Sequence, residues 1–371
     1  MDPQAQFCHN RDCPARGVVG QGNIRVHSRK EQRYRCTICR RTFAATRGTP
    51  FYRLETPPET VTTVTTLLCH GCPPQAIVAA FGFDERTIAR WQQRTGQHCQ
   101  GFHEHGVQRG QIDLQHVQAD ELNVKAVGRR FWMAMAMAVP SRLWLGGVIS
   151  VRRDLALITA LVAMVRSCAR SLAILVCVDG LASYVTAFVR VFRHRVHTGR
   201  PGRPRLEEEP GLLIGQVVKH YAKRRVVGVT RRVVRGTAAA ILAVLTATGT
   251  GTGINTAYIE RLNATFRAAA APLTRRGRAI ARTEEALQAE MFLVGCAYNF
   301  CWEHESLRQA ASAGACSQWR GRTPAMAAGL TDHRWTMQEL LSYQVPPSPW
   351  VAPKRRGRPP KLYKSEKRPA A

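Results

Sequence analysis

Three acidic residues, Asp120, Asp179 and Glu260, are the strongest candidates for chemistry in this sequence. Asp120 lies in a predicted strand, and Asp179 directly follows the apolar run 174–178. Glu260 falls in a predicted helix. A carboxylate at the end of a buried strand does not stabilise an apolar core, because charged side chains are rarely buried without a partner. Ligands, by contrast, bind at the carboxyl ends of strands in an open sheet. We therefore expect the three side chains to converge on one site.

Three converging carboxylates would repel one another unless a cation held them together. Magnesium takes such oxygen ligands, and two ions about 3.5 to 4 Å apart activate a water or a 3′-hydroxyl and stabilise the leaving oxygen. The trio therefore predicts phosphodiester chemistry with Mg²⁺, or Mn²⁺, bound by Asp120, Asp179 and Glu260. Taken singly, the three have ordinary alternatives as a strand-edge charge, a helix N-cap and a solvated helix residue, respectively.

Side chains beside these acids are further candidates. Alternation along the strand puts Glu121 on the opposite face from Asp120, and the pattern alone does not decide which of the two faces the site. On the helix of Glu260, Asn263 and Arg267 share roughly one face with it through the three- and four-residue spacing. We assign Asn263 and Arg267 as candidate contacts to nucleic acid.

Four cysteines near the N-terminus have the spacing of a metal site. Cys8 and Cys13 form one pair and Cys36 and Cys39 the other, separated by glycine, polar and basic residues. Two such pairs satisfy the tetrahedral preference of zinc, and the metal replaces a core too small to fold alone. We predict a zinc ribbon over 1–55 that binds Zn²⁺ through these four thiolates, with Phe43, Phe51 and Tyr52 packed beneath it. Ordinary buried thiols are the alternative.

The other cysteines are predicted to be mostly structural. Cys69 and Cys72 form another CxxC pair without an obvious second pair, although His98 and Cys99 are candidates, so whether they bind metal stays open. The remaining five stand singly in apolar surroundings and are expected in the core: Cys168, Cys177, Cys296, Cys301 and Cys316.

The segment 110–310 must position the acids, and its pattern is mixed α/β. Apolar runs from 112 to 150, broken at Gly128 and at Pro140, predict three strands joined by short turns. A helix over 155–168, a buried strand over 173–178 and a helix over 181–192 follow. Strands are predicted between 213 and 234, and helices over 237–247, 255–271 and 283–302.

Between the cysteines and this body, 56–105 predicts a helix-turn-helix. Apolar residues at helical spacing form three runs, and Gly82 suits the turn before the third, for which Asp84 is a good N-cap. Such a helix fits a major groove. A small helical bundle or dimerisation element is the alternative. The predicted outward-facing contacts to DNA are Arg86, Thr87, Arg90 and Gln93.

The composition predicts a polyanionic partner. The chain has 371 residues with 54 Lys and Arg against 25 Asp and Glu, a formal net charge of +29 spread over its length. Its 45% hydrophobic content supports a sizeable core. No apolar run reaches about 20 residues, so we expect no membrane span. The N-terminus lacks a signal-peptide pattern, so we expect the protein to be in the reducing cytoplasm, where it would be associated with the nucleoid.

Two further basic segments are candidate DNA contacts. Near 195–210, the Gly- and Pro-rich run 199–205 predicts an exposed basic loop in which Arg200 and Arg203 would contact phosphates, although a plain linker is equally compatible. After an extension over 311–350, the tail 351–371 carries Arg356 and Arg358 in an Arg-Gly-Arg-Pro string. It looks like an AT-hook for the narrow minor groove, or else a solvated basic tail.

The acidic motifs resemble those of DDE transposases of bacterial insertion sequences, of the IS1-like type. The run 253–267, Gly-Ile-Asn-Thr-Ala-Tyr-Ile-Glu-Arg-Leu-Asn-Ala-Thr-Phe-Arg, resembles the helix that carries the catalytic Glu in that family. The stretches 119–122 and 178–180 resemble its two Asp motifs, and 298–301 and 323–327 resemble its C-terminal phrases. The chain departs from the family at 123–125, where an aromatic residue is expected. The resemblance implies a zinc ribbon, a helix-turn-helix and an RNase H-like core in this order, with Asp120 rather than Glu121 as the first catalytic acid.

We therefore expect a multidomain α/β transposase that binds transposon ends and carries out metal-dependent hydrolysis and strand transfer on double-stranded DNA. Two ends must be held together, so a homodimer or larger synaptic complex is expected. One alternative is a catalytically inactive DNA-binding protein or regulator derived from a transposase. Another is a metal-dependent nuclease that cannot join ends.

Overall fold

The computed structural model describes residues 1–196, 199, 203–223, 225–274, 280–311 and 318–352. The chain divides into two compact units. The first consists of Met1–Arg47 together with the described residues from Pro346 onward, and the second of Gly48–Val345. The predictions for Arg200, Cys316, Arg356 and Arg358 lie outside the described residues.

The first unit is a small antiparallel sheet beside the four cysteines. Its strands are β1 (Ile24–Ser28), β2 (Arg33–Cys36) and β3 (Thr42–Ala44), paired in the order β1-β2-β3. Its core is correspondingly small and contains Cys8, Cys13, Ala15, Ile24, Tyr34, Cys36 and Phe43. The predicted position of Phe51 beneath this sheet is wrong, because its ring belongs to the core of the second unit.

The second unit begins with three helices, α1 (Pro58–Cys69), α2 (Pro74–Phe81) and α3 (Glu85–Gly106). The predicted turn is confirmed: Gly82 ends α2 with a φ of 70°, and the Asp84 carboxylate accepts a hydrogen bond from the amide of Arg86 at 2.8 Å. Beneath the turn, the rings of Phe83 and Trp91 pack edge to face, with centroids 5.0 Å apart. Trp91 is buried, so the turn is anchored to the core of the second unit.

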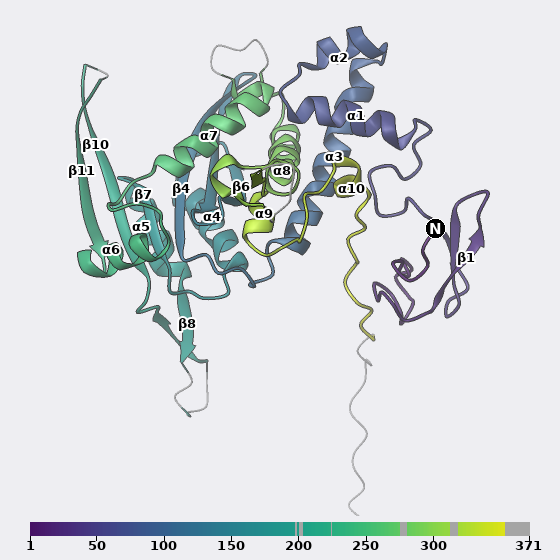
Figure 1. Ribbon diagram of the computed structural model, residues 1–371, viewed down its shortest axis with the longest axis horizontal. Coiled ribbons are helices and arrows are strands. Elements are labelled where there is room, and N and C mark those ends of the chain that lie inside the picture. Colours follow the sequence, from purple (N-terminus) through teal and green to yellow (C-terminus); the bar gives the residue numbers. More distant parts are fainter. Residues whose placement is uncertain (197–198, 200–202, 224, 275–279, 312–317, 353–371) are drawn as a thin grey trace, which may run out of the picture. The chain divides into compact units, whose positions relative to one another are not determined.

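A six-stranded mixed sheet forms the centre of the second unit (Figure 1). The strands β4 (His116–Ala126), β5 (Arg129–Ala138) and β6 (Leu143–Ser150) form an antiparallel meander. β7 (Leu175–Asp179) lies parallel to β4, and β10 (Leu213–Ala222) lies parallel to β7. β11 (Arg225–Arg235) completes the order β11-β10-β7-β4-β5-β6 as an antiparallel edge strand. The predicted mixed α/β class is confirmed.

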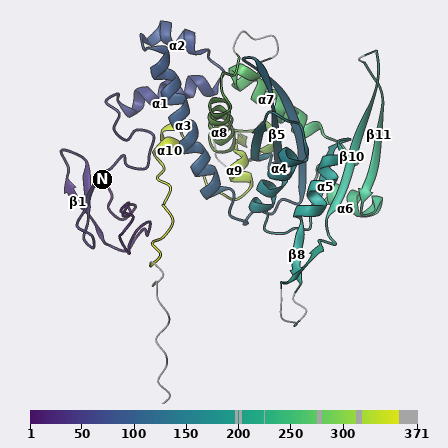
Figure 2. The ribbon, with the colours of Figure 1, turned by 180° about the vertical axis from the view of Figure 1, so that it is seen from behind.

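Helices cover both faces of this sheet. Adjacent residues of β4 point to opposite faces: Asp120 contacts α7 (Ala257–Ala269) through Asn263, and Glu121 contacts α5 (Ala182–Val191) through Tyr184. α4 (Leu155–Cys168) packs beside α5, as Figure 2 shows from behind. The buried helix α8 (Glu284–Phe300) packs against α3 and β6.

The remaining elements are short. α6 (Ala238–Ala247) packs on β10, and the chain then forms 3-10 turns at Ala271–Leu273 and Glu305–Leu307. β12 (Gln309–Ala310) pairs with β13 (Trp319–Arg320), before α9 (Pro324–Ala327) and α10 (Met337–Ser342). Among the described residues, no helix combines the length and apolar character that crossing a membrane requires.

The segment near 195–210 differs from the predicted loop. β8 (Arg193–Val196) and β9 (Arg205–Glu208) pair as a two-stranded antiparallel ladder around it. Glu208 forms ion pairs with Arg193 and with Arg235. An acidic residue that follows the Gly- and Pro-rich run therefore forms ion pairs with arginines of other strands. The number of basic residues in the run does not indicate these ion pairs.

Candidate functional site

Two parallel strands bring the predicted aspartates together. β4 and β7 pair from His116 with Leu175 to Gln118 with Cys177. Continuing this register by two residues puts Asp120 beside Asp179, at the carboxyl end of β7. On the other side of β7, Val217 of β10 is paired with Asp179. The convergence expected of strand-end acids is thus confirmed for this pair.

Glu260 reaches the same region because a buried glutamine holds the start of its helix. The side-chain oxygen of Gln118 accepts hydrogen bonds from the amides of Tyr258 and Ile259, at 3.1 and 3.0 Å. Its amide nitrogen donates to the carbonyl of Asn255 at 2.8 Å. Gln118 lies two residues before Asp120, on the same face of β4. It therefore fixes the first turn of α7, which contains Glu260, against the strand that carries the first acid.

The three predicted acids line one cavity of about 420 Å³. Its wall also contains basic and aromatic side chains, so the cavity combines both signs of charge. The other lining residues are Arg153, Gly180, Leu181, Val217, Val218, Lys219, Tyr221 and Thr256.

The group of carboxylates close enough to share a metal ion differs from the predicted trio. Oxygen atoms of Asp120, Glu121 and Asp179 all lie within 4.8 Å of one another, and this group does not include Glu260. One Glu260 oxygen instead accepts from the ammonium of Lys219 at 2.6 Å and from the hydroxyl of Thr256 at 2.9 Å.

Glu121 is part of the site although it faces away from Asp120. The residue is only 8% exposed, and its second oxygen accepts a hydrogen bond from the hydroxyl of Tyr184 at 2.8 Å. Arg153 forms an ion pair with its first oxygen and also reaches Asp179, at 3.5 Å. The guanidinium therefore ties the two carboxylates together from the face covered by α5.

The proton affinity of the Asp120 carboxyl is raised at this site. Burial, reinforced by the charge of Glu121 and further by those of Asp179 and Glu260, raises the pKa of Asp120 to about 7. Its oxygens accept hydrogen bonds from the amide of Glu121 at 2.9 Å and from the side-chain amide of Asn263 at 2.8 Å. A bound cation would favour the ionised form of such a crowded carboxyl, so the side chains present fit a divalent metal.

The four predicted cysteines form a second group with metal-ligand geometry. The sulfurs of Cys8 and Cys39 are 3.6 Å apart, those of Cys13 and Cys36 are 3.9 Å apart, and all four lie within 4.8 Å of one another. Zinc–sulfur bonds of about 2.3 Å in a tetrahedron require sulfur–sulfur distances of about 3.8 Å. The side-chain amide of Asn23 also points its nitrogen at the Cys36 sulfur, at 3.7 Å, as an outer partner of a thiolate would. The cluster could bind zinc.

The single cysteines were expected in the core, and this is confirmed for those among the described residues. Cys168, Cys177, Cys296 and Cys301 are buried. Within the described residues, Cys69 and Cys72 belong to no group of three or more close metal-ligand side chains.

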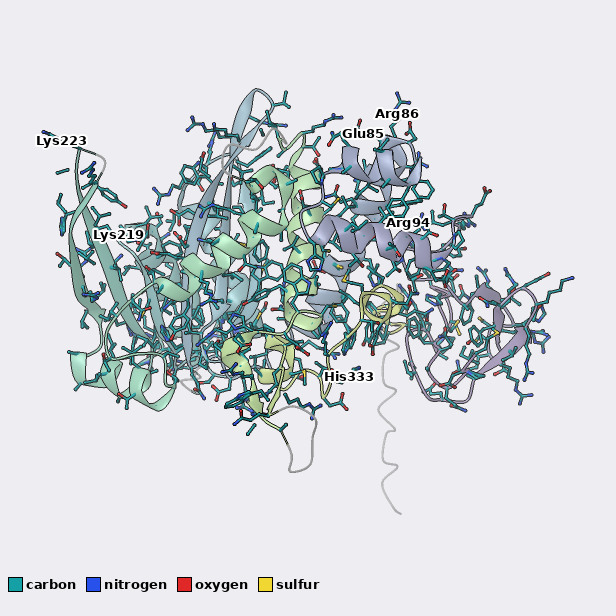
Figure 3. All side chains as sticks on the ribbon, turned by 45° about the horizontal axis from the view of Figure 1, so that its top comes forward. Glu85, Arg86, Arg94, Lys219, Lys223 and His333 are labelled. Atoms are coloured by element: carbon teal, nitrogen blue, oxygen red, sulfur yellow. The ribbon has the colours of Figure 1, made fainter. Side chains whose placement is uncertain are left out.

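The predicted DNA contacts on α3 lie on its outer side. Arg86, Arg90 and Gln93 are exposed, and Thr87 is half-buried. Figure 3 shows Glu85 and Arg86 together at the beginning of the helix, with Arg86 directed outward.

The other described candidates for DNA contacts are in different surroundings. Arg203 is exposed and Arg267 is half-buried. Asn263 is only 2% exposed and donates to Asp120, so its side chain is placed to orient that carboxylate.

Sequence reasoning missed four site residues: Gln118, Arg153, Tyr184 and Lys219. Gln118 left a usable signal, since a polar residue two positions before Asp120 shares its face of the strand. The others left none, because their contacts with the acids depend on how α5, β10 and the loop before α4 pack on the sheet.

No protein-family model matches the chain, and no curated protein is significantly similar to it.

Proposed function

We propose that the chain is a DNA transposase of the DDE type, which cuts and joins phosphodiester bonds with Asp120, Asp179 and Glu260. The observation that carries the proposal is that Asp120 and Asp179, on adjacent parallel strands, have carboxylate oxygens within 4.8 Å of each other, with Glu260 lining the same cavity. The strand order supports an RNase H-like core, since such cores consist of an antiparallel meander extended by parallel strands that follow helices.

In this proposal Asp120 and Asp179 hold Mg²⁺, and Glu260 completes the site. The bound metal would supply a nucleophilic water or 3′-hydroxyl and neutralise charge at the leaving oxygen. Asn263 orients Asp120, and Gln118 holds the helix of Glu260 in place. Arg153 fixes Asp179 and Glu121, while Lys219 brings a positive charge to the cavity wall, where phosphate oxygens would lie.

The N-terminal parts would deliver DNA to this site. We propose that the four-cysteine unit is a zinc ribbon and that α2 and α3 form a helix-turn-helix, together binding transposon ends. The unit 1–47 has ten Lys and Arg against three Asp and Glu, which supports contact with a polyanion. Holding two ends at once requires two or more copies of the chain.

The rival proposal is a DNA-binding protein that has lost catalysis. It is favoured by one observation: Glu260 pairs with Lys219 and stands outside the group of carboxylates close enough to share a metal ion. In that protein the basic side chains would balance the acids, and DNA binding would remain.

The deciding experiment is magnesium-dependent cleavage and joining of labelled duplexes taken from the DNA that flanks the coding sequence. We expect the full-length protein to cut and join, and the variants Asp120→Ala, Asp179→Ala and Glu260→Ala to bind the duplex without doing either. The matched control is Glu55→Ala, which removes an exposed carboxylate outside the cavity. Binding by the wild type without any cleavage would refute the enzyme and support the rival.

A further inference from the structure

The β10–β11 hairpin continues beyond the sheet at the edge where the carboxylates lie. β10 pairs with β7 only from Leu213 to Val217, opposite Leu175 to Asp179. From Val218 onward its strand partner among the described residues is β11 alone. Figure 1 shows the two strands extending past β7. Lys219 and Tyr221, on this free part, line the cavity of the three acids.

The free part of the hairpin is basic and lacks acidic residues. The sequence from 210 to 259 contains no Asp or Glu. Lys223 and Arg225 at the tip are exposed, as are Arg231 and Arg232 on β11. Figure 3 shows Lys223 at the tip and Lys219 lower on the same hairpin. Within the described residues, the ion pairs of β10 and β11 are those of Lys219 with Glu260 and of Arg235 with Glu208, so the tip charges have no acidic partner.

Apolar side chains are exposed among these charges. Tyr221 and Val227 are each 65% exposed, and Val226 is 50% exposed. The pairing shifts between His220 and Tyr221, a bulge that increases the twist of the hairpin. A surface of this kind fits a partner that offers both anionic and apolar groups. Duplex DNA does so, because its major groove, about 12 Å wide, admits a two-stranded ribbon and presents thymine methyl groups between two rows of phosphates.

We propose that the described residues of this hairpin, 218–223 and 225–230, form a DNA-gripping arm that lies in the major groove of the duplex beside the bond held at the acidic cavity. This inference rests on the proposed function and names the surface that holds the substrate. A second copy of the chain is the competing occupant of the β11 edge. Charge argues against it, since pairing two such edges would bring rows of arginine side chains together.

The test is a salt-dependent binding titration of the full-length protein on a labelled duplex of about 30 base pairs, without magnesium, so that cutting does not enter. The double variant Lys223→Gln/Arg225→Gln removes two tip charges. The control, Arg109→Gln/Arg190→Gln, removes two exposed charges at the amino-terminal end of the parallel strands, since Arg109 precedes β4 and Arg190 is in the last turn of α5.

The slope of log affinity against log salt is negative, and we expect its magnitude to fall by about 1.8 for the hairpin variant, because each phosphate that the protein no longer neutralises reduces that magnitude by about 0.9. The control should keep the wild-type slope. We also expect the wild type, but not the hairpin variant, to protect guanine N7 atoms from methylation, because N7 lies in the major groove.

Equal slopes for the wild type and the hairpin variant would overturn the proposal. So would equal losses in the hairpin and control variants, because binding would then depend on total charge. A hairpin variant that changes from dimer to monomer in light scattering while keeping its slope would assign the edge to a second copy. The proposed enzyme is judged separately. If the wild type never cuts DNA but its salt slope still differs from that of the hairpin variant, the transposase proposal is refuted and the proposal of a DNA-gripping arm stands.

Discussion

Gln118 offers the sharpest test of how the site is assembled. The variant Gln118→Leu introduces an apolar side chain of similar size and removes the acceptor of the Tyr258 and Ile259 amides and the donor to Asn255. Each buried amide left without a partner costs about 1 to 3 kcal/mol. Burial of the added apolar surface offsets about 1 kcal/mol of this. We therefore expect the free energy of unfolding to fall by about 3 kcal/mol.

Denaturant unfolding followed by tryptophan fluorescence measures this loss. Hydrogen exchange of the peptide covering 253–267 reports where it occurs, since the first turn of α7 should exchange faster. The control Gln97→Leu changes an exposed glutamine of α3 and should alter stability by no more than about 0.5 kcal/mol. If the proposed function holds, cleavage should also fall by about 100-fold, because Glu260 would be misplaced by about 1 Å. Unchanged stability together with unchanged exchange of α7 would refute the reasoning.

Three further predictions address the acids, the cysteines and the core. The folded-state pKa of Asp120, about 7, lies above its ordinary value of 3.8, so the folded state binds this proton more strongly and loses stability as pH rises from about 4 to about 7. In magnesium-free buffer, Asp120→Asn should therefore gain stability relative to wild type between pH 5 and pH 8, and a constant difference would contradict the cause given for the shift. Cys36→Ser should abolish binding of one zinc per chain, measured by metal analysis, whereas Cys72→Ser should leave the zinc content unchanged; equal zinc in both would refute the assignment. Gly295→Ala would put a methyl group 2.2 Å from the Trp144 ring and should cost at least about 1 to 3 kcal/mol in thermal or denaturant unfolding. Gly101→Ala, also helical but with open space around it, should instead stabilise by up to about 1 kcal/mol, and equal effects of the two would exclude the close contact.

Features that depend on local pattern were predictable from the sequence. The helix 155–168 has the predicted bounds, and the turn before α3 has the expected glycine and aspartate because a left-handed turn and an N-cap are local requirements. The strand-end position of Asp179 followed from its apolar run and the break after it.

Features that depend on packing between distant segments were not predictable. Glu121 joins Asp120 and Asp179 in one group of close carboxylates. Its carboxylate is held there by Arg153 and Tyr184, on the face of the sheet that α5 covers. The pairing of Glu260 with Lys219 requires β10 to extend beyond β7, which periodicity cannot reveal. The strands beside the Gly- and Pro-rich run 199–205 were missed because their pairing joins basic residues to acidic ones that follow later in the chain.

The hydrogen bonds between Gln118 and α7 also bear on when the acidic cavity can be completed during protein synthesis. The two segments are 140 residues apart in the chain, and the last acid of the cavity arrives only on the later one. β4 and β7, which carry both aspartates, are synthesised before Glu260. Completion of the acidic cavity is therefore tied to the emergence of the C-terminal third, and a prematurely ended product would contain α1, α2 and α3 without a finished site.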